Sequence, residues 1–155
     1  GALAESPSMN AAWTEGGVRV FSEVNLGLAV AVDDGLVVPV IRNADRLSLD
    51  ELAQRSREAA DLAQSDKLQP VDYQDGTFTV SNLGMFGIDR FTAIINPPQC
   101  GILAVGRVAP RVVSYGDNIE VRLMMTVTLS ADHRVVDGVI AGRFLQRVKR
   151  RLEDI

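Results

Sequence analysis

The chain has 155 residues, 46% of them hydrophobic and 23% charged, which is enough apolar material for one globular domain with a core of its own. The formal net charge of −4 lacks the basic character that nucleic-acid binding usually requires. Cys100 is the only cysteine and His133 the only histidine, which excludes an intramolecular disulfide and any metal site built from several such residues.

The beginning of the chain is typical of the last turn or two of a helix that ends before Pro7. A helix of that length is not stable alone. We therefore expect the natural domain to continue upstream of Gly1. No run of residues is long and apolar enough to span a membrane.

Short strands are expected next. Residues 18–21 follow a glycine turn, and residues 28–32 alternate apolar and small side chains. The Asp-Asp-Gly sequence at 33–35 predicts a hairpin, with residues 36–41 as the returning strand. Pro39 has no N–H to donate, so its surroundings should be an edge or a bulge.

Two helices are predicted. Ser48 and Glu51 have the spacing of a capping box, which opens a helix running to about Gln64. A second helix follows Gly138, with apolar residues at helical spacing and a basic end at residues 149–151 that complements the helix dipole.

The second half of the chain contains further strands. Residues 77–80 form a strand, residues 85–94 an irregular loop, and residues 101–105 a buried strand. The longest predicted strand covers residues 120–129, where apolar side chains alternate with polar ones. Together with the two helices, these elements predict an α+β domain whose mixed or antiparallel sheet is covered by helices.

His133 is the first candidate for a catalytic residue. It lies where the longest predicted strand ends, between Asp132 and Asp137, either of which could orient an imidazole ring. Histidine is the side chain whose ordinary pKa lies near neutrality, as a general base needs. A lone histidine is more often a surface or core residue, and the spacing HxxxD is common by chance, so this pattern leaves both interpretations open.

Five short blocks of the sequence can be compared, in chain order, with a known protein family. They are GLVVPV at 35–40, TFTVSNLGMFGI at 77–88, IINPPQ at 94–99, MMTVTLS at 124–130 and DHRVVDG at 132–138. These blocks resemble the catalytic core of the dihydrolipoamide acyltransferases of 2-oxo acid dehydrogenase complexes, whose signature is DHRxxDG. The resemblance covers nearly the whole chain. It is greatest for the pyruvate dehydrogenase (acetyl) branch, with a branched-chain acyl group as the alternative.

The resemblance implies acyl transfer between a dihydrolipoyl thiol and coenzyme A, on a fold like that of chloramphenicol acetyltransferase. In this family the histidine at the position of His133 is the general base, a role that contributes typically about 10²–10⁴-fold to the rate. A serine at the position of Ser81 donates to the oxyanion, and loss of such a donor costs roughly 10²–10³-fold. The other interpretation of Ser81 is a turn residue that bonds its own backbone.

Asp137 is the third residue of the predicted catalytic site. It either orients the imidazole or forms a structural ion pair with an arginine that holds the catalytic turn. We favour the structural role, which the related chloramphenicol acetyltransferases give to this aspartate. Arg134 is then structural as well, and Asn82 and Asn96 are candidates for fixing loops.

Cys100 and the loop at residues 85–90 are not assigned a catalytic role. Cys100 is not needed as a nucleophile, because the acyl group passes directly between two thiols, and we interpret it as a small buried apolar residue. Residues 85–90 are either a plug of the core or a wall of the apolar channel for the lipoyl arm. No residue is assigned to coenzyme A, and no metal is expected.

The resemblance also implies partners. The family forms homotrimers that pack into larger cores, with the serine on one subunit and the histidine on its neighbour. We expect residues 1–155 to be the C-terminal part of a single catalytic domain, without roughly its first third. The resemblance implies that the lipoyl group and the sites for the decarboxylase and dihydrolipoamide dehydrogenase belong to modules outside this chain. The compartment that we expect is the bacterial cytoplasm, or the mitochondrial matrix if the protein is eukaryotic.

Two other functions compete with this one. The protein could be a structural scaffold with a degenerate site, although the intact Ser81 and His133 argue against it. It could also be a coenzyme A-dependent acetyltransferase for a small alcohol or amine, which the SNLG and NPPQ blocks disfavour.

Overall fold

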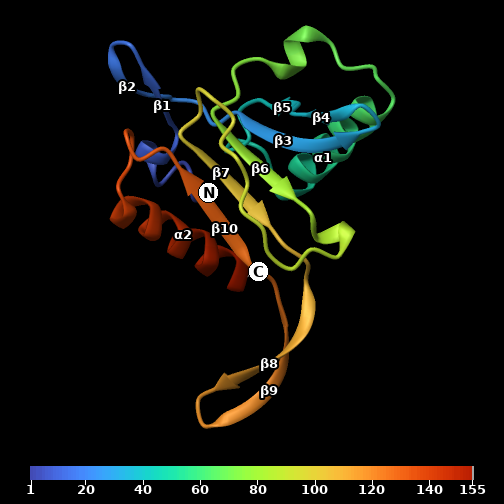
Figure 1. Ribbon diagram of the computed structural model, residues 1–155, viewed down its shortest axis with the longest axis vertical. Coiled ribbons are helices and arrows are strands. Elements are labelled where there is room, and N and C mark those ends of the chain that lie inside the picture. Colours follow the sequence, from blue (N-terminus) through green and yellow to red (C-terminus); the bar gives the residue numbers. More distant parts are fainter. Residues whose placement is uncertain (155) are drawn as a thin grey trace.

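The centre of the structure is one mixed sheet of six strands, in which five follow the order β10-β7-β6-β3-β4 and β5 pairs with β3 (Figure 1). This computed structural model describes residues 1–154. The strands of the sheet are β3 (Leu26–Val32), β4 (Gly35–Val37), β5 (Val40–Ile41), β6 (Phe78–Asn82), β7 (Gly101–Val105) and β10 (Val127–Ala131). β6 runs parallel to β3 and to β7, and the other pairs are antiparallel. The predicted α+β class with a mixed sheet is therefore confirmed.

Helix α1 (Leu49–Gln64) lies on the long connection that allows β3 and β6 to run parallel, since parallel neighbours cannot be joined by a tight turn. Its start is the predicted capping box. The Ser48 hydroxyl accepts from the Glu51 N–H at 3.3 Å, and the Glu51 carboxylate accepts from the Ser48 N–H at 2.8 Å. The helix ends at Gln64, as predicted, and packs against β3 and β5.

Helix α2 (Gly138–Glu153) covers the face of the sheet that carries most of the core. Phe144 of this helix is 2% exposed and packs edge-to-face on Phe78 of β6, with 5.6 Å between the ring centroids. Cys100 belongs to the same cluster and is fully buried, which confirms its interpretation as a small core residue. Burial raises the pKa of the Cys100 thiol, so its reactive thiolate is disfavoured.

The predicted long strand over residues 120–129 is wrong. The chain forms two strands there, β9 (Asn118–Met124) and β10, with a break at residues 125–126. β9 pairs with β8 (Ala109–Tyr115) in a hairpin that extends well away from the sheet, whereas β10 pairs with β7 (Figure 1). The alternating sequence continues through the break, so it carries no signal that the pairing partner changes.

Two smaller predictions are also revised, and one strand was missed. The predicted strand 36–41 is divided into β4 and β5, with Pro39 in the interruption. The first residues form turns and a 3-10 helix (Pro7–Met9) in place of the end of an α-helix. β2 (Gly17–Val20) pairs with β1 (Ala11–Thr14), a strand that was not predicted because Ala11 and Ala12 are both buried and show no alternation. Across residues 1–154, no helix has both the length and the apolar character needed to cross a membrane.

Candidate active site

Ser81 and His133 lie toward opposite ends of the central sheet within one chain. Ser81 of β6 pairs with Ala104 of β7, which pairs in turn with Thr128 of β10. β10 runs antiparallel to both, so the chain moves away from the level of Ser81 as it proceeds to His133. Two strand spacings of about 4.8 Å and five residues of about 3.3 Å rise place the two Cα atoms roughly 19 Å apart. The structure therefore does not bring the two residues together within one chain.

Ser81 lies in a strand, half-buried, on the face of the sheet away from α2. Its neighbour Val80 aligns with Leu103 and packs against the core, so the alternation of the strand turns Ser81 to the other side. The local turn bond is made by Asn82, whose side-chain oxygen accepts from the Gly84 N–H at 2.8 Å. The interpretation of Ser81 as a turn residue is thus not favoured, and Asn82 fixes the loop as expected.

His133 is exposed in the turn between β10 and α2, and both neighbouring carboxylates are engaged elsewhere. Asp132 accepts from the guanidinium of Arg134, with 2.6 Å between Oδ2 and Nη2 and 3.0 Å between Oδ1 and Nε. These bonds, together with the Arg134 N–H, hold the pKa of the Asp132 carboxyl below its usual value. Arg134 therefore forms an ion pair within the histidine turn, with Asp132 as its partner.

Asp137 caps helix α2. Its Oδ1 accepts from the Ile140 N–H at 2.8 Å, and its backbone has the extended conformation of an N-cap residue. Among residues 1–154, Asp137 takes part in no ion pair, which differs from the arginine contact that we favoured. The cap fixes where α2 begins and so holds the C-terminal end of the histidine turn.

A recess of about 690 Å³ adjoins the histidine turn, and Asp132, Arg134 and Trp13 are among the residues that line it. The Arg134 guanidinium lies over the indole of Trp13, 5.6 Å from the ring centroid. Sequence reasoning missed Trp13 because it lies in β1, the strand without an alternating pattern. The available signal was that it is the only tryptophan of the chain.

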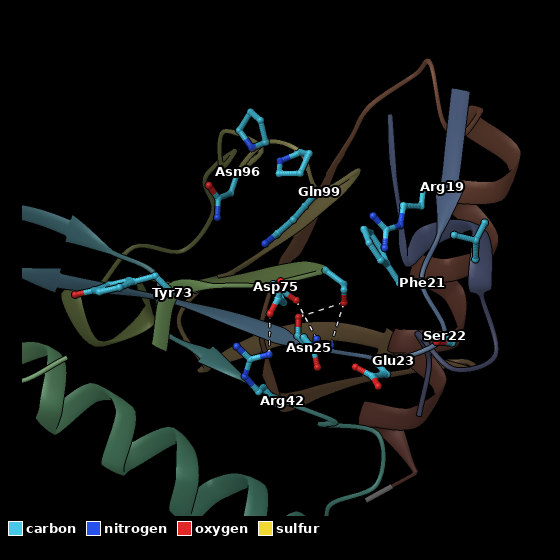
Figure 2. Close-up of a pocket in the computed structure, with 15 residues that line it drawn as sticks. Arg19, Phe21, Ser22, Glu23, Asn25, Arg42, Tyr73, Asp75, Asn96 and Gln99 are labelled. Atoms are coloured by element: carbon cyan, nitrogen blue, oxygen red, sulfur yellow. Dashed lines mark hydrogen bonds and ion pairs between the residues drawn. The ribbon is translucent and has the colours of Figure 1, made fainter. Parts of the chain in front are cut away.

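Figure 2 shows a second recess, of about 680 Å³, which shares Gln99 and the two prolines before it with the first. Arg42 pairs there with Asp75 at 2.9 Å, and Arg19 lies over the ring of Phe21. Glu23 also lines this recess. With two arginines and two carboxylates, the recess is polar and balanced in charge. Its arginines are candidates for contacting an anionic group of a cofactor.

The loop after Ser81 is open to solvent. Met85 is 82% exposed and Phe86 62% exposed, which contradicts the interpretation of this loop as a core plug. In the part of the chain that the structure describes, no group of three His, Cys, Asp or Glu side chains is arranged to hold a metal ion.

The family model described as "2-oxoacid dehydrogenases acyltransferase (catalytic domain)" matches residues 1–155. The chain belongs to this family. The dihydrolipoyllysine-residue acetyltransferase component of the pyruvate dehydrogenase complex of Rickettsia bellii is 45% identical over 152 residues, which are 98% of this chain and 36% of that protein. The chain therefore spans a little more than a third of the length of this curated relative.

Solved structures of family members have the same fold. A probable dihydrolipoamide acetyltransferase of Listeria monocytogenes has a TM-score of 0.96 at 42% identity, over 99% of this chain and 66% of that one. The dihydrolipoamide acetyltransferase of Azotobacter vinelandii, studied for the catalytic role of one serine, one histidine and one asparagine, has a TM-score of 0.90 at 41% identity, over 94% of this chain and 61% of that one.

Two further structures extend this comparison. The cubic core of a pyruvate dehydrogenase multienzyme complex is 41% identical, with a TM-score of 0.90, over 94% of this chain and 60% of that one. A chloramphenicol acetyltransferase has a TM-score of 0.63 at 16% identity, over 96% of this chain and 71% of that one, which shows a shared fold. The predicted family and the predicted chloramphenicol acetyltransferase-like fold are both confirmed.

Proposed function

We propose that this protein transfers an acetyl group between coenzyme A and a dihydrolipoyl thiol, as part of a pyruvate dehydrogenase complex. The observation that carries the proposal is the spacing of the site residues. Ser81 precedes His133 by the same number of residues that separates the serine and the histidine studied in the Azotobacter vinelandii enzyme. Asp137 follows His133 by the same number of residues as the asparagine follows the histidine in that enzyme. The choice of acetyl over a branched-chain acyl group is supported by the Rickettsia bellii relative.

The mechanism follows from the chemistry of thiols. An alkyl thiol is mostly protonated at neutral pH, and its thiolate is the nucleophile. The neutral imidazole of His133 takes the thiol proton while sulfur attacks the thioester carbon. A new carbon–sulfur bond forms, and the carbonyl electrons move to oxygen, where the Ser81 hydroxyl donates a hydrogen bond. Collapse of this intermediate breaks the old carbon–sulfur bond, and the imidazolium returns its proton to the departing thiolate.

We further propose that Ser81 and His133 act across a subunit interface. Their separation of roughly 19 Å within one chain exceeds the reach of two side chains that must contact the same thioester group. A neighbouring copy that supplies the second residue removes this difficulty. The cubic core formed by a related protein supports the assembly of several copies, and a homotrimer is the smallest ring consistent with the family resemblance.

The β8–β9 hairpin provides a surface for such an assembly. Its strands pair Val112 with Val121 and Pro110 with Leu123, which places these four side chains on one face. The hairpin extends away from the body of the protein, so Val112, Val121 and Leu123 are 71%, 70% and 72% exposed (Figure 1). A continuous apolar strip of this kind is costly in water, so it favours burial against a second copy.

The test is acetyl transfer from acetyl-coenzyme A to dihydrolipoamide by the full-length protein. We expect His133→Ala to lose about 10²–10⁴-fold in rate and Ser81→Ala about 10²–10³-fold, with unchanged particle size by light scattering. Ser65→Ala, on the exposed end of α1, is the matched control and should behave as wild type. Wild-type activity in His133→Ala would contradict the mechanism and favour a scaffold with a degenerate site.

A further inference from the structure

The loop that follows Ser81 is held against the connection between β7 and β8. The Leu83 N–H donates to the carbonyl oxygen of Val105 at 3.1 Å, and the Arg107 N–H donates to that of Ile88 at 2.8 Å. Between these two bonds, the backbone of the loop lies directly on Gly106. A Cβ atom at Gly106 would meet the carbonyl oxygen of Asp89 at 2.0 Å, so this approach requires glycine.

Asp89 closes the loop with two ion pairs. Its Oδ1 lies 3.0 Å from Nη2 of Arg107 and 3.0 Å from Nη2 of Arg111, and it also accepts from Nε of Arg107 at 3.0 Å. Hydrogen bonds from Arg111 and then Arg107 hold the pKa of the Asp89 carboxyl below its usual value. One carboxylate therefore connects the end of the Ser81 loop to the base of β8.

The rest of the loop contributes little to its own placement. Met85 and Phe86 are largely exposed, so the loop buries few apolar side chains that could anchor it. Two backbone hydrogen bonds and the charged group of Asp89 are its described connections to the β7–β8 segment. A segment with few buried contacts opens readily, which makes the ion pairs the part of the anchor that a side-chain substitution can remove.

We infer that Asp89 is a positioning residue for acyl transfer, which keeps Ser81 in its productive place by pairing with Arg107 and Arg111. The inference rests on the proposed function and goes beyond it, since Asp89 touches neither substrate nor the reacting atoms. The Ser81 hydroxyl acts on the oxyanion, which exists only near the transition state. Misplacing it should therefore lower kcat and leave the KM for acetyl-coenzyme A unchanged.

The experiment compares kcat and KM for Asp89→Asn, Asp89→Glu and wild type in the full-length protein. Exposed ion pairs are weak individually, and small misplacements at a site are amplified, so we expect kcat of Asp89→Asn to fall about fivefold to tenfold. Asp89→Glu keeps the charge and should recover most of the loss. The control is Glu120→Gln, which removes the Glu120–Arg122 ion pair of the β8–β9 hairpin. Glu120 does not contact the loop that follows Ser81, so this variant should leave kcat unchanged.

Two further measurements separate positioning from general destabilisation. If Asp89 and Arg111 act through the ion pair between them, the double variant Asp89→Asn with Arg111→Gln should be no slower than Asp89→Asn alone. Amide hydrogen exchange, which does not depend on activity, should speed up at Leu83 and Arg107 in Asp89→Asn and stay unchanged at Leu103 in β7.

The outcomes are distinguishable. An active wild type with unchanged kcat and unchanged exchange in Asp89→Asn overturns this inference and leaves the proposed function intact. Equal losses in Asp89→Asn and Glu120→Gln also overturn it, because the effect would then belong to the hairpin in general. A folded wild type without any acetyl transfer overturns the proposed function, and with it the role of Asp89 in acyl transfer.

Discussion

Mixing two inactive variants should restore activity if the active site is shared between subunits. In Ser81→Ala the subunit keeps its histidine, and in His133→Ala it keeps its serine. When the two are dissociated, mixed and reassembled, some interfaces combine the intact serine of one subunit with the intact histidine of its neighbour. The prediction follows from the sheet register, which places the two residues roughly 19 Å apart in one chain.

The size of the recovery can be calculated. At equal amounts and with random assembly into closed rings, each interface receives an intact serine with probability one half and an intact histidine with probability one half. About a quarter of the sites are then complete, so the mixture should have about 25% of wild-type activity. The separate variants should each retain no more than about 1%.

The assay is acetyl transfer to dihydrolipoamide before mixing, after mixing without dissociation, and after reassembly. Only the reassembled sample should gain activity, and its particle size should equal that of wild type. A reassembled mixture that is no more active than the mean of the two variants would refute a shared site. Ser81 and His133 would then have to meet within one chain, against the register of the sheet.

Three other predictions concern individual side chains. Asp137→Asn should retain wild-type activity within a few-fold because asparagine is also a good N-cap, whereas Asp137→Ala should lose about 1 kcal/mol of stability in urea denaturation; a large loss of kcat in a stable Asp137→Asn would show instead that the carboxylate charge is needed. Phe144→Ala removes the buried ring that packs on Phe78 and should cost about 3–5 kcal/mol in the free energy of unfolding, and a cost below about 1 kcal/mol would contradict the core described above. Asp132 has a lowered pKa, so its pairing with Arg134 contributes stability above its ordinary value of 3.8 and loses it as the pH falls through the lower folded-state pKa. The difference in stability between wild type and Asp132→Asn should therefore be constant above about pH 5 and shrink in acid, and a difference that does not change as the pH is lowered would contradict this.

The features that the sequence predicts correctly depend on neighbours along the chain. The capping box of Ser48 and Glu51 and the hairpin at residues 33–34 require groups only a few residues apart. The helix after Gly138 is visible because its apolar side chains repeat at helical spacing. The sequence also contains the serine and the histidine of the candidate site, and the family resemblance suggests their roles.

Other features depend on contacts between distant segments, and the sequence carries no local sign of them. The alternation over residues 120–129 is the same on either side of the break, but β9 pairs with β8 and β10 pairs with β7. The deciding fact is which strand lies opposite. The cap of Asp137 on the Ile140 N–H is different, because it spans three residues and was open to prediction from the sequence.

The separation of Ser81 and His133 is the clearest example. The sequence identifies both residues and gives the number of residues between them, which does not determine their distance in space. That distance follows from the order β10-β7-β6 and from the opposite direction of β10, which long-range hydrogen bonds between strands establish. The same holds for Asp89, whose two arginines lie 18 and 22 positions farther along the chain and approach it only because β7 carries the chain back past the Ser81 loop.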